Sequence, residues 1–453
     1  MLAEFQRNIW LRFTAYRVLA MPIILGVVFF VTYVSNGRQI DPDMATVAAV
    51  LFAALAFPWG NRVTAESLSE EIVARTWDQQ RMSAMSATSM VFGKLFGATL
   101  IVWIGMAFCA GVFAFSQWEL VEQRELILST LLLVLAGALG HGVTFLFTLL
   151  GVQRRGSLRA IRTGLYQVLG ALTGLPLVYI AATGLGEIEE TSFILLYERV
   201  FDPLLFVIMT AGLIYLLLLA TAIAAMRQEF QQTNPFWLWP LGLLATMAYF
   251  HGVEVITAID LHGLTLPPPG WFPAFLIALA ATYIAVFSEA KSSLTLIDIR
   301  YRFRDGEWAR GLSLIPNSLF ALLALGGALV MLKVEGIDWT VGLLPGNAEP
   351  FLISLALLAV RDVALVHIFS LLSPNFGERR AFLILLVIYT VVPLLFSALE
   401  VYDFLGVFWP LWVEGYEQGV YQAGAAAAVS IALMLRLYAI ASSNVRKLER
   451  KST

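Results

Sequence analysis

The amino-acid sequence predicts an all-α fold, a polytopic membrane helical bundle. The chain of 453 residues is 59% hydrophobic and only 13% charged, whereas soluble globular domains carry about 25% charged residues. Many windows of about 18 or more residues contain almost no charge, which is long enough for a helix to cross a hydrocarbon core roughly 30 Å thick. These runs are about twice as long as a barrel strand and do not alternate with period two, so we expect helices.

Twelve such runs follow one another along the chain, and each is expected to form one membrane span. Their approximate ranges are 18–34, 44–60, 90–115, 126–150, 163–183, 203–226, 236–256, 271–288, 312–332, 350–372, 381–399 and 420–441.

A short amphipathic helix is expected before the first span. Five apolar side chains fall in one narrow sector at 100° per residue: Leu2, Phe5, Ile9, Phe13 and Tyr16. Glu4 and Arg7 lie on the opposite side of such a helix. This pattern predicts an N-terminal helix that lies in the membrane interface, with its polar side toward water.

The distribution of positive charge predicts the orientation of the spans. With the N-terminus inside, 24 of the 29 Lys and Arg residues fall on the cytoplasmic side, as the positive-inside rule requires. Both termini are then cytoplasmic, and the outer loops are acidic. No cleavable signal peptide is apparent. Basic inner loops are typical of a multi-pass protein of the bacterial plasma (inner) membrane.

The two longest water-facing stretches, 61–89 and 289–311, each follow the second span of a six-span set. Trp77 in the first stretch and Trp308 in the second are 231 positions apart. We interpret this spacing as a tandem duplication in one orientation, with a first half at 1–230 and a second at 231–453. Apolar and charged residues mix in these stretches, which is typical either of solvated connectors or of helices that dock a cytoplasmic partner through an aromatic anchor.

A series of residues in the first stretch carries a family resemblance. It consists of Glu71, then Arg75-Thr76-Trp77-Asp78, then Met82-Ser83-Ala84-Met85-Ser86, then Gly93-Lys94. This series resembles the membrane subunits of type 2 ABC exporters, in which an interfacial helix and two spans precede a cytoplasmic coupling helix, and a Gly-Lys pair leads into the third span. The resemblance covers about 1–230. The second half is similar mainly in its span layout and in Trp308 with Pro316, and the family usually has proline where Ala84 stands.

The resemblance implies a transmembrane permease subunit of an ATP-binding cassette exporter. Two copies of a separate nucleotide-binding ATPase subunit would bind ATP and Mg²⁺, so this chain would need no cofactor, no metal and no catalytic site. Gly93-Lys94 lacks the upstream Gly and the following Ser or Thr of a phosphate-binding loop. Membrane lipids are expected partners, and nucleic acid is not. The residues that the resemblance assigns to ATPase coupling are Glu71, Arg75, Thr76, Trp77, Asp78, Arg81, Arg304, Asp305, Glu307 and Trp308.

Six polar residues are expected within the spans, where ionisable groups are costly and often functional. They are His141, His251, Glu254, Arg361, Asp362 and His367. Arg361 and Asp362 are interpreted either as functional charges or as a structural ion pair. His251 and Glu254 are three positions apart and could share one helix face, as a metal or proton site or as a simple hydrogen-bonded pair. His141 is expected to be a hydrogen-bonded core histidine.

Two other functions fit parts of the sequence. A proton-coupled secondary transporter of twelve spans also suits parallel six-span repeats, but only Asp362, and Glu254 if it lies in the membrane, would supply acidic groups for coupling. A membrane-embedded enzyme would need paired carboxylates, a metal cluster or a nucleophile with its base, and the sequence shows no such arrangement. The exporter permease is therefore the favoured hypothesis.

Overall fold

The computed structural model describes most of the chain. The described residues are 3–12, 15–40, 42–82, 85–155, 163–183, 192–197, 199–232, 234–257, 270–289, 293–335, 349–372, 377–399, 405–410 and 418–452. Ala84, where the exporter family usually has proline, lies outside them, as do Leu2 and Phe13 of the predicted N-terminal stripe.

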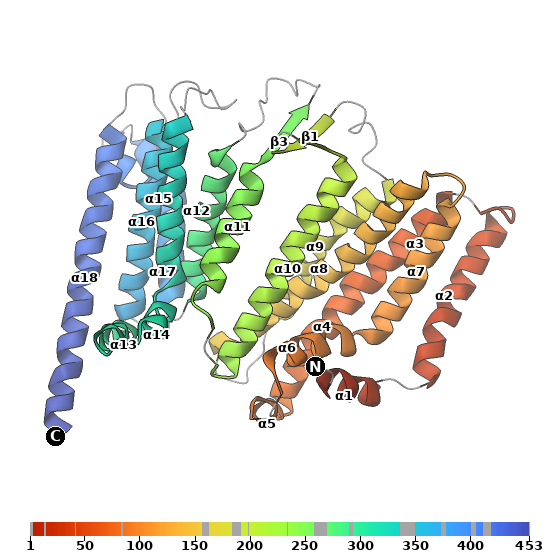
Figure 1. Ribbon diagram of the computed structural model, residues 1–453, viewed down its shortest axis with the longest axis horizontal. Helices are drawn as coiled ribbons and strands as arrows, with labels where there is room; N and C mark the ends of the chain where they lie inside the picture. Colours follow the sequence, from red (N-terminus) through yellow and green to blue (C-terminus); the bar gives the residue numbers. More distant parts are fainter. Residues whose placement is uncertain are drawn as a thin grey trace. The chain divides into compact units, whose positions relative to one another are not determined.

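Helices dominate the fold, as the sequence predicts (Figure 1). In the first part of the chain they are α1 (Ala3–Arg12), α2 (Ala15–Ser35), α3 (Pro42–Ala54), the π-helical turn η1 (Leu55–Gly60), α4 (Asn61–Val73), α5 (Trp77–Arg81), α6 (Ala87–Phe92), the π-helical turn η2 (Gly93–Gly97), α7 (Leu100–Gln117), α8 (Gln123–Arg155), α9 (Thr163–Thr183) and α10 (Pro203–Glu229). The later ones are α11 (Leu238–His251), α12 (Trp271–Ser288), α13 (Ser293–Arg304), α14 (Trp308–Ser313), α15 (Asn317–Glu335), α16 (Glu349–Leu372), α17 (Gly377–Ala398), the 3-10 turn η4 (Leu405–Val407) and α18 (Gln418–Ser452).

Ten helical segments among the described residues are long and apolar enough to cross a membrane, which is the pattern of a multi-pass membrane protein. They are Val18–Ser35, Pro42–Val73, Leu100–Gln117, Gln123–Gln153, Thr163–Thr183, Pro203–Glu229, Trp271–Ser288, Asn317–Glu335, Glu349–Leu372 and Gln418–Ile440. Two predicted spans are not among them. The apolar part of α17, Arg380–Phe396, is shorter, and α11 has only 14 residues.

The predicted span 236–256 is wrong at its C-terminal end. Helix α11 ends at His251, and the β-branched sequence that follows forms strand β3 (Val253–Thr257). This strand pairs with β1 (Ser192–Leu196), which in turn pairs with β2 (Arg199–Phe201), in the order β2-β1-β3. Glu254 therefore lies in a strand and His251 ends a helix, so the expectation that the two share one helix face is wrong.

The chain divides into two compact units, residues 1–193 with 201–234 and residues 194–200 with 235–453. In the first unit the long helix α8 packs against α9, α10 and α4, and α3 packs against α7. In the second unit α16 packs against α18, α17 and α12, and α12 packs against α15. Each unit buries its own apolar clusters, so each has a core of its own.

Polar elements gather at one end of each unit's helices. In the first unit, α1 and α5 lie at the same end (Figure 1). In the second unit, α13 and α14 lie at the end opposite to β3 (Figure 1).

Most described residues of the stretch 61–89 are helical. Helices α3 and α4 form one helical run, Pro42–Val73, through the turn η1, so the second predicted span continues far beyond residue 60.

Candidate functional site

Helix α1 docks through its polar side, contrary to the sequence prediction. The carboxylate of Glu4 is completely buried and Asn8 is also buried, whereas Trp10 is exposed. The amide of Asn8 donates to the carbonyl oxygen of Glu4 at 2.9 Å and reaches the Gly93 carbonyl oxygen at 3.4 Å. Helix α1 ends at Arg12, so Tyr16 belongs to the next helix. The predicted orientation, with Glu4 toward water, is therefore wrong.

A charge cluster joins α1 to the rest of the first unit, with Glu4 and Lys94 buried and Arg7 partly exposed. It consists of Glu4, Arg7, Glu71 and Lys94, two carboxylates and two cations, and we call it the α1 cluster. Arg7 forms a bidentate pair with Glu4, at 2.9 Å through Nε and 2.7 Å through Nη2. Its Nη2 also lies 2.5 Å from Oε1 of Glu71. Lys94 Nζ lies 2.5 Å from Oε2 of Glu71 and 3.5 Å from Glu4.

Lys94 is the most deeply buried cation of this cluster. Only 1% of its side chain is exposed, and its ammonium also donates to the carbonyl oxygen of Ser67 at 3.0 Å. A buried charge is tolerated when it is paired and hydrogen-bonded. Because the four charges balance and come from three separate segments, the α1 cluster ties the N-terminal helix to α4 and to η2.

Gly93 gives α1 the room to approach. A β-carbon added at Gly93 would lie 2.5 Å from Cγ of Glu4 and 2.9 Å from the backbone nitrogen of Phe5. Both distances are shorter than real β-carbon contacts, so any larger residue would displace the helix. The Gly-Lys pair that carries the family resemblance therefore has a local structural role here. Gly93 leaves room for α1 to pack closely, and Lys94 balances the negative charge of Glu4 and Glu71.

Trp77 is buried and does not form an exposed anchor. Only 5% of it is accessible, and it packs with Leu68 and Met90 in an apolar cluster. Its Nε1 donates to Glu229 Oε1 at 3.1 Å, at the end of α10. The interpretation of Trp77 as a side chain that enters a partner's groove is therefore wrong. Trp77 instead joins α5 to α10.

Other residues of the first stretch remain accessible around Trp77. The side chain of Asp78 is 79% exposed and lies 3.5 Å from Arg81. Arg81 also donates through Nε to the carbonyl oxygen of Glu229 at 3.1 Å. Val73, Arg75 and Met82 are exposed, and Thr76 is half-buried. We call the exposed set Val73, Arg75, Asp78 and Met82 the α5 surface. It combines two charges with two apolar side chains.

The second predicted stretch is more exposed. Helix α14 begins at Trp308, which is 64% exposed and meets Phe303 edge-on, with ring centroids 5.2 Å apart. Arg304 and Asp305 are exposed. Glu307 pairs with Arg310 at 2.9 Å and with Arg302 at 2.6 Å. Hydrogen bonds from Arg310 and Arg302 hold the pKa of the Glu307 carboxyl below its usual value.

The two stretches share one backbone arrangement. In the first, Thr76 N–H donates to Glu71 O and Arg75 N–H donates to Ile72 O. In the second, Glu307 N–H donates to Arg302 O and Gly306 N–H donates to Phe303 O. Each pair of bonds closes a helix by a Schellman motif, whose left-handed residue is Arg75 (φ 58°) or Gly306 (φ 79°). A short helix then begins two residues later, at Trp77 or Trp308.

The predicted charges Arg361 and Asp362 form a buried pair in the middle of α16. Arg361 donates to Oδ1 of Asp362 through Nε at 2.9 Å and through Nη2 at 2.7 Å. Oδ2 of Asp362 accepts from the hydroxyl groups of Tyr283 at 2.7 Å and Tyr389 at 2.6 Å. Arg361 also donates to the carbonyl oxygen of Val407. This Tyr-Asp-Arg cluster links α12, α16, α17 and η4.

The three histidines predicted within spans each contact a neighbouring group. His141 is buried in α8 with Nε2 3.0 Å from the carbonyl oxygen of Ala56 in η1, so Nε2 carries the proton. His367 Nδ1 lies 2.9 Å from the hydroxyl group of Tyr438. His251 packs on Trp271 with ring centroids 4.6 Å apart. Within the described parts of the chain, no group of three or more His, Cys, Asp or Glu side chains is placed to hold a metal ion.

Sequence reasoning missed several members of these clusters. The amphipathic pattern predicts a water-facing surface for Glu4 and Arg7, and no local pattern marks Glu229, Tyr283 or Tyr389. One signal was present for the α1 cluster. Lys94 stands inside the predicted apolar span 90–115, and a cation in that position requires a buried counter-ion. The identity of that counter-ion depends on packing between distant segments.

Comparison with protein-family models, curated proteins and solved structures found no match to this chain.

Proposed function

We propose that this chain is the transmembrane permease subunit of an ATP-driven exporter. It would lie in a bacterial plasma membrane with both termini in the cytoplasm, and it would contact two copies of a separate ATPase that carries ATP and Mg²⁺. The chain would supply the path and no covalent chemistry. The observation that carries the proposal is that the stretches 61–89 and 289–311 share a helix, a Schellman turn and a short helix that begins at a tryptophan.

The surroundings of the α5 surface support a coupling role. Trp77 and Arg81 join α5 to Glu229 at the end of α10, while Gln80 donates to Glu71 of the α1 cluster at 2.7 Å. Helix α4 belongs to the continuous helical run Pro42–Val73. A displacement of α5 would therefore be transmitted to helices expected to span the membrane, because packed helices move as rigid bodies rather than deforming continuously.

The alternative is a proton-coupled secondary transporter that uses Asp362. Both oxygens of this carboxylate already accept hydrogen bonds, from Arg361 on one side and from two tyrosines on the other. Protonation in each cycle would have to break this network. The arrangement therefore favours a structural pair and, with it, the ATP-driven mechanism.

Purification of the chain with its native companions tests the proposal directly. We expect a soluble ATPase of about 25–35 kDa, a typical domain size, to copurify with the chain and to hydrolyse ATP faster in its presence. If the chain purifies without an ATPase and drives proton-dependent uptake alone in vesicles, the permease proposal is wrong and the secondary transporter replaces it.

Reversal of the charge at position 78 tests the α5 surface. Asp78→Lys is expected to weaken ATPase binding by about fivefold or more, because placing a like charge against a partner's cation costs at least about 1 kcal/mol. The variant should fold normally because Asp78 is exposed. Binding is measured by titrating the purified ATPase onto the chain in nanodiscs.

Glu119→Lys is the matched control for this variant. Glu119 is also exposed, and it lies in the connection between α7 and α8, outside the α5 surface. Its reversal is expected to leave ATPase affinity unchanged. Equal affinity of Asp78→Lys and the unaltered chain would show that the α5 surface does not contact the ATPase.

A further inference from the structure

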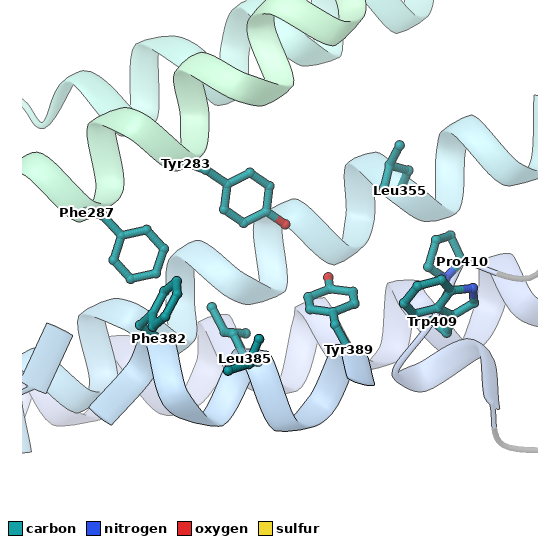
Figure 2. Close-up of a pocket in the computed structure, with 9 residues that line it drawn as sticks. Tyr283, Phe287, Leu355, Phe382, Leu385, Tyr389, Trp409 and Pro410 are labelled. Atoms are coloured by element: carbon teal, nitrogen blue, oxygen red, sulfur yellow. The ribbon is translucent and has the colours of Figure 1, made fainter. Parts of the chain in front are cut away.

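A pocket of about 530 Å³ opens beside the Tyr-Asp-Arg cluster in the second unit. Helices α12, α16 and α17 and the segment after η4 supply its lining, which consists of Tyr283, Phe287, Leu355, Phe382, Leu385, Leu386, Tyr389, Trp409 and Pro410. Figure 2 shows the rings of Phe287 and Phe382 at one end, Trp409 and Pro410 at the other, and Tyr283 and Tyr389 between them. The volume lies within the range of small-molecule sites, about 300–1,000 Å³.

The mouth of the pocket faces outward from the helices. Phe382 is 54% exposed and Leu386 is 49% exposed, whereas Leu385 between them is buried. Helices α12 and α16 are apolar enough to cross a membrane, and α17 contributes a shorter apolar helix. In a membrane this mouth would therefore meet lipid rather than water.

The only polar atoms of the lining side chains are the two tyrosine hydroxyl groups and the indole nitrogen of Trp409. The hydroxyl oxygens of Tyr283 and Tyr389 point toward each other (Figure 2), and both hydroxyl groups donate to Asp362. Arg361 neutralises Asp362 directly. Because the charges are balanced behind the tyrosines, the pocket offers no unpaired ion for a charged ligand.

We propose that this pocket binds the hydrocarbon chain of a membrane lipid, which enters between Phe382 and Leu386 and ends against the Tyr283–Tyr389 pair. Water would find few partners on this lining, whereas a hydrocarbon chain would gain contact with five aromatic side chains and three leucines. The proposal goes beyond the permease function. It requires a multi-pass membrane protein and no ATPase, so either proposal can fail without the other.

Photocrosslinking tests the site. The chain is reconstituted in vesicles of phosphatidylethanolamine and phosphatidylglycerol that contain a phospholipid with a diazirine in its acyl chain, and adducts are mapped by peptide mass spectrometry. We expect adducts to concentrate on residues 382–389 and on Trp409. Leu385→Trp, which fills the pocket, is expected to lower this yield by about fivefold or more.

Two further variants make the result decisive. Leu386→Trp blocks the mouth from a half-exposed position and should lower the yield similarly, even if the buried Leu385→Trp substitution overpacks the core and fails to fold. Leu383→Trp, on the same helix and exposed but outside the lining, should leave the yield unchanged. Equal adduct yields at 382–389 in the unaltered chain and in Leu386→Trp would overturn the proposal, since contact with bulk lipid alone would then explain the labelling.

Discussion

Replacement of Asp362 by leucine is expected to lower the free energy of unfolding by about 3–5 kcal/mol, the usual result of breaking a buried ion pair. The substitution leaves the Arg361 guanidinium in the middle of α16 without its counter-ion and removes the acceptor of two tyrosine hydroxyl groups. The change would appear as a lower apparent melting temperature in detergent, followed by intrinsic fluorescence at a fixed scan rate because membrane proteins commonly unfold irreversibly.

A double substitution separates the loss of charge balance from the loss of packing. Arg361→Met with Asp362→Leu removes both charges, and apolar replacements of similar volume are often neutral or stabilising. We therefore expect most of the stability to return. Asp298→Leu is the control, because it breaks a partly exposed pair with Arg302 and such pairs contribute little. A double variant as unstable as Asp362→Leu would show that the ion pair is not the main source of the loss.

Lys94→Met is expected to release α1 from the first unit. Of the two cations in the α1 cluster, Arg7 alone would then remain beside Glu4 and Glu71. We expect a destabilisation of about 3–5 kcal/mol, as for other buried pairs that lose one partner. Hydrogen exchange of residues 3–12 reports the release directly, since local opening becomes easier as docking weakens. Cys109, the only cysteine, is buried in α7, so its rate of labelling reports unfolding of the first unit.

A second substitution that restores the charge balance separates the effect of charge from the effect of packing. Lys94→Met with Glu71→Gln restores charge balance, and the glutamine retains a carbonyl oxygen that Arg7 and Gln80 can contact. Slower exchange of residues 3–12 in this double variant than in Lys94→Met alone would support the α1 cluster. Arg62→Met removes an exposed pair with Glu66 on α4 and should leave exchange in α1 unaltered. If Lys94→Met also leaves hydrogen exchange of residues 3–12 unaltered, the α1 cluster does not stabilise the docking of α1.

Local patterns in the sequence predict most of the apolar helices. Long uncharged runs identify apolar helices because the signal lies within each segment. The end of the predicted span 236–256 failed because hydropathy does not distinguish a helix from a strand in a short apolar run such as Val253–Thr257. Val253–Thr257 forms a strand because it pairs with β1, about 60 residues earlier.

The candidate sites depend on contacts that a local pattern does not contain. The charges around Trp77 in the sequence predict an exposed anchor, but Glu229, 152 positions later, accepts its indole N–H. The position of Glu4 opposite an apolar stripe predicts that it faces water, but Glu4 is buried beside Lys94. The sequence predicts Asp362 as a charge within a span. Tyr283 and Tyr389, which donate to it, have no sequence pattern that distinguishes them from other aromatic residues of a span.

The turn that closes α4 places an arginine in a left-handed backbone conformation, where α13 uses a glycine. A side chain in that conformation is disfavoured by roughly 1–2 kcal/mol, and glycine avoids this strain. The C-terminal ends of α4 and α13 therefore share a backbone conformation but differ in the side chain that they present. Under the permease proposal, two identical companions would meet non-identical faces on one chain. The two ATPase copies would then bind in a preferred order, one with a lower dissociation constant than the other. A homodimeric permease presents two identical binding faces, so its sequence does not encode such a difference.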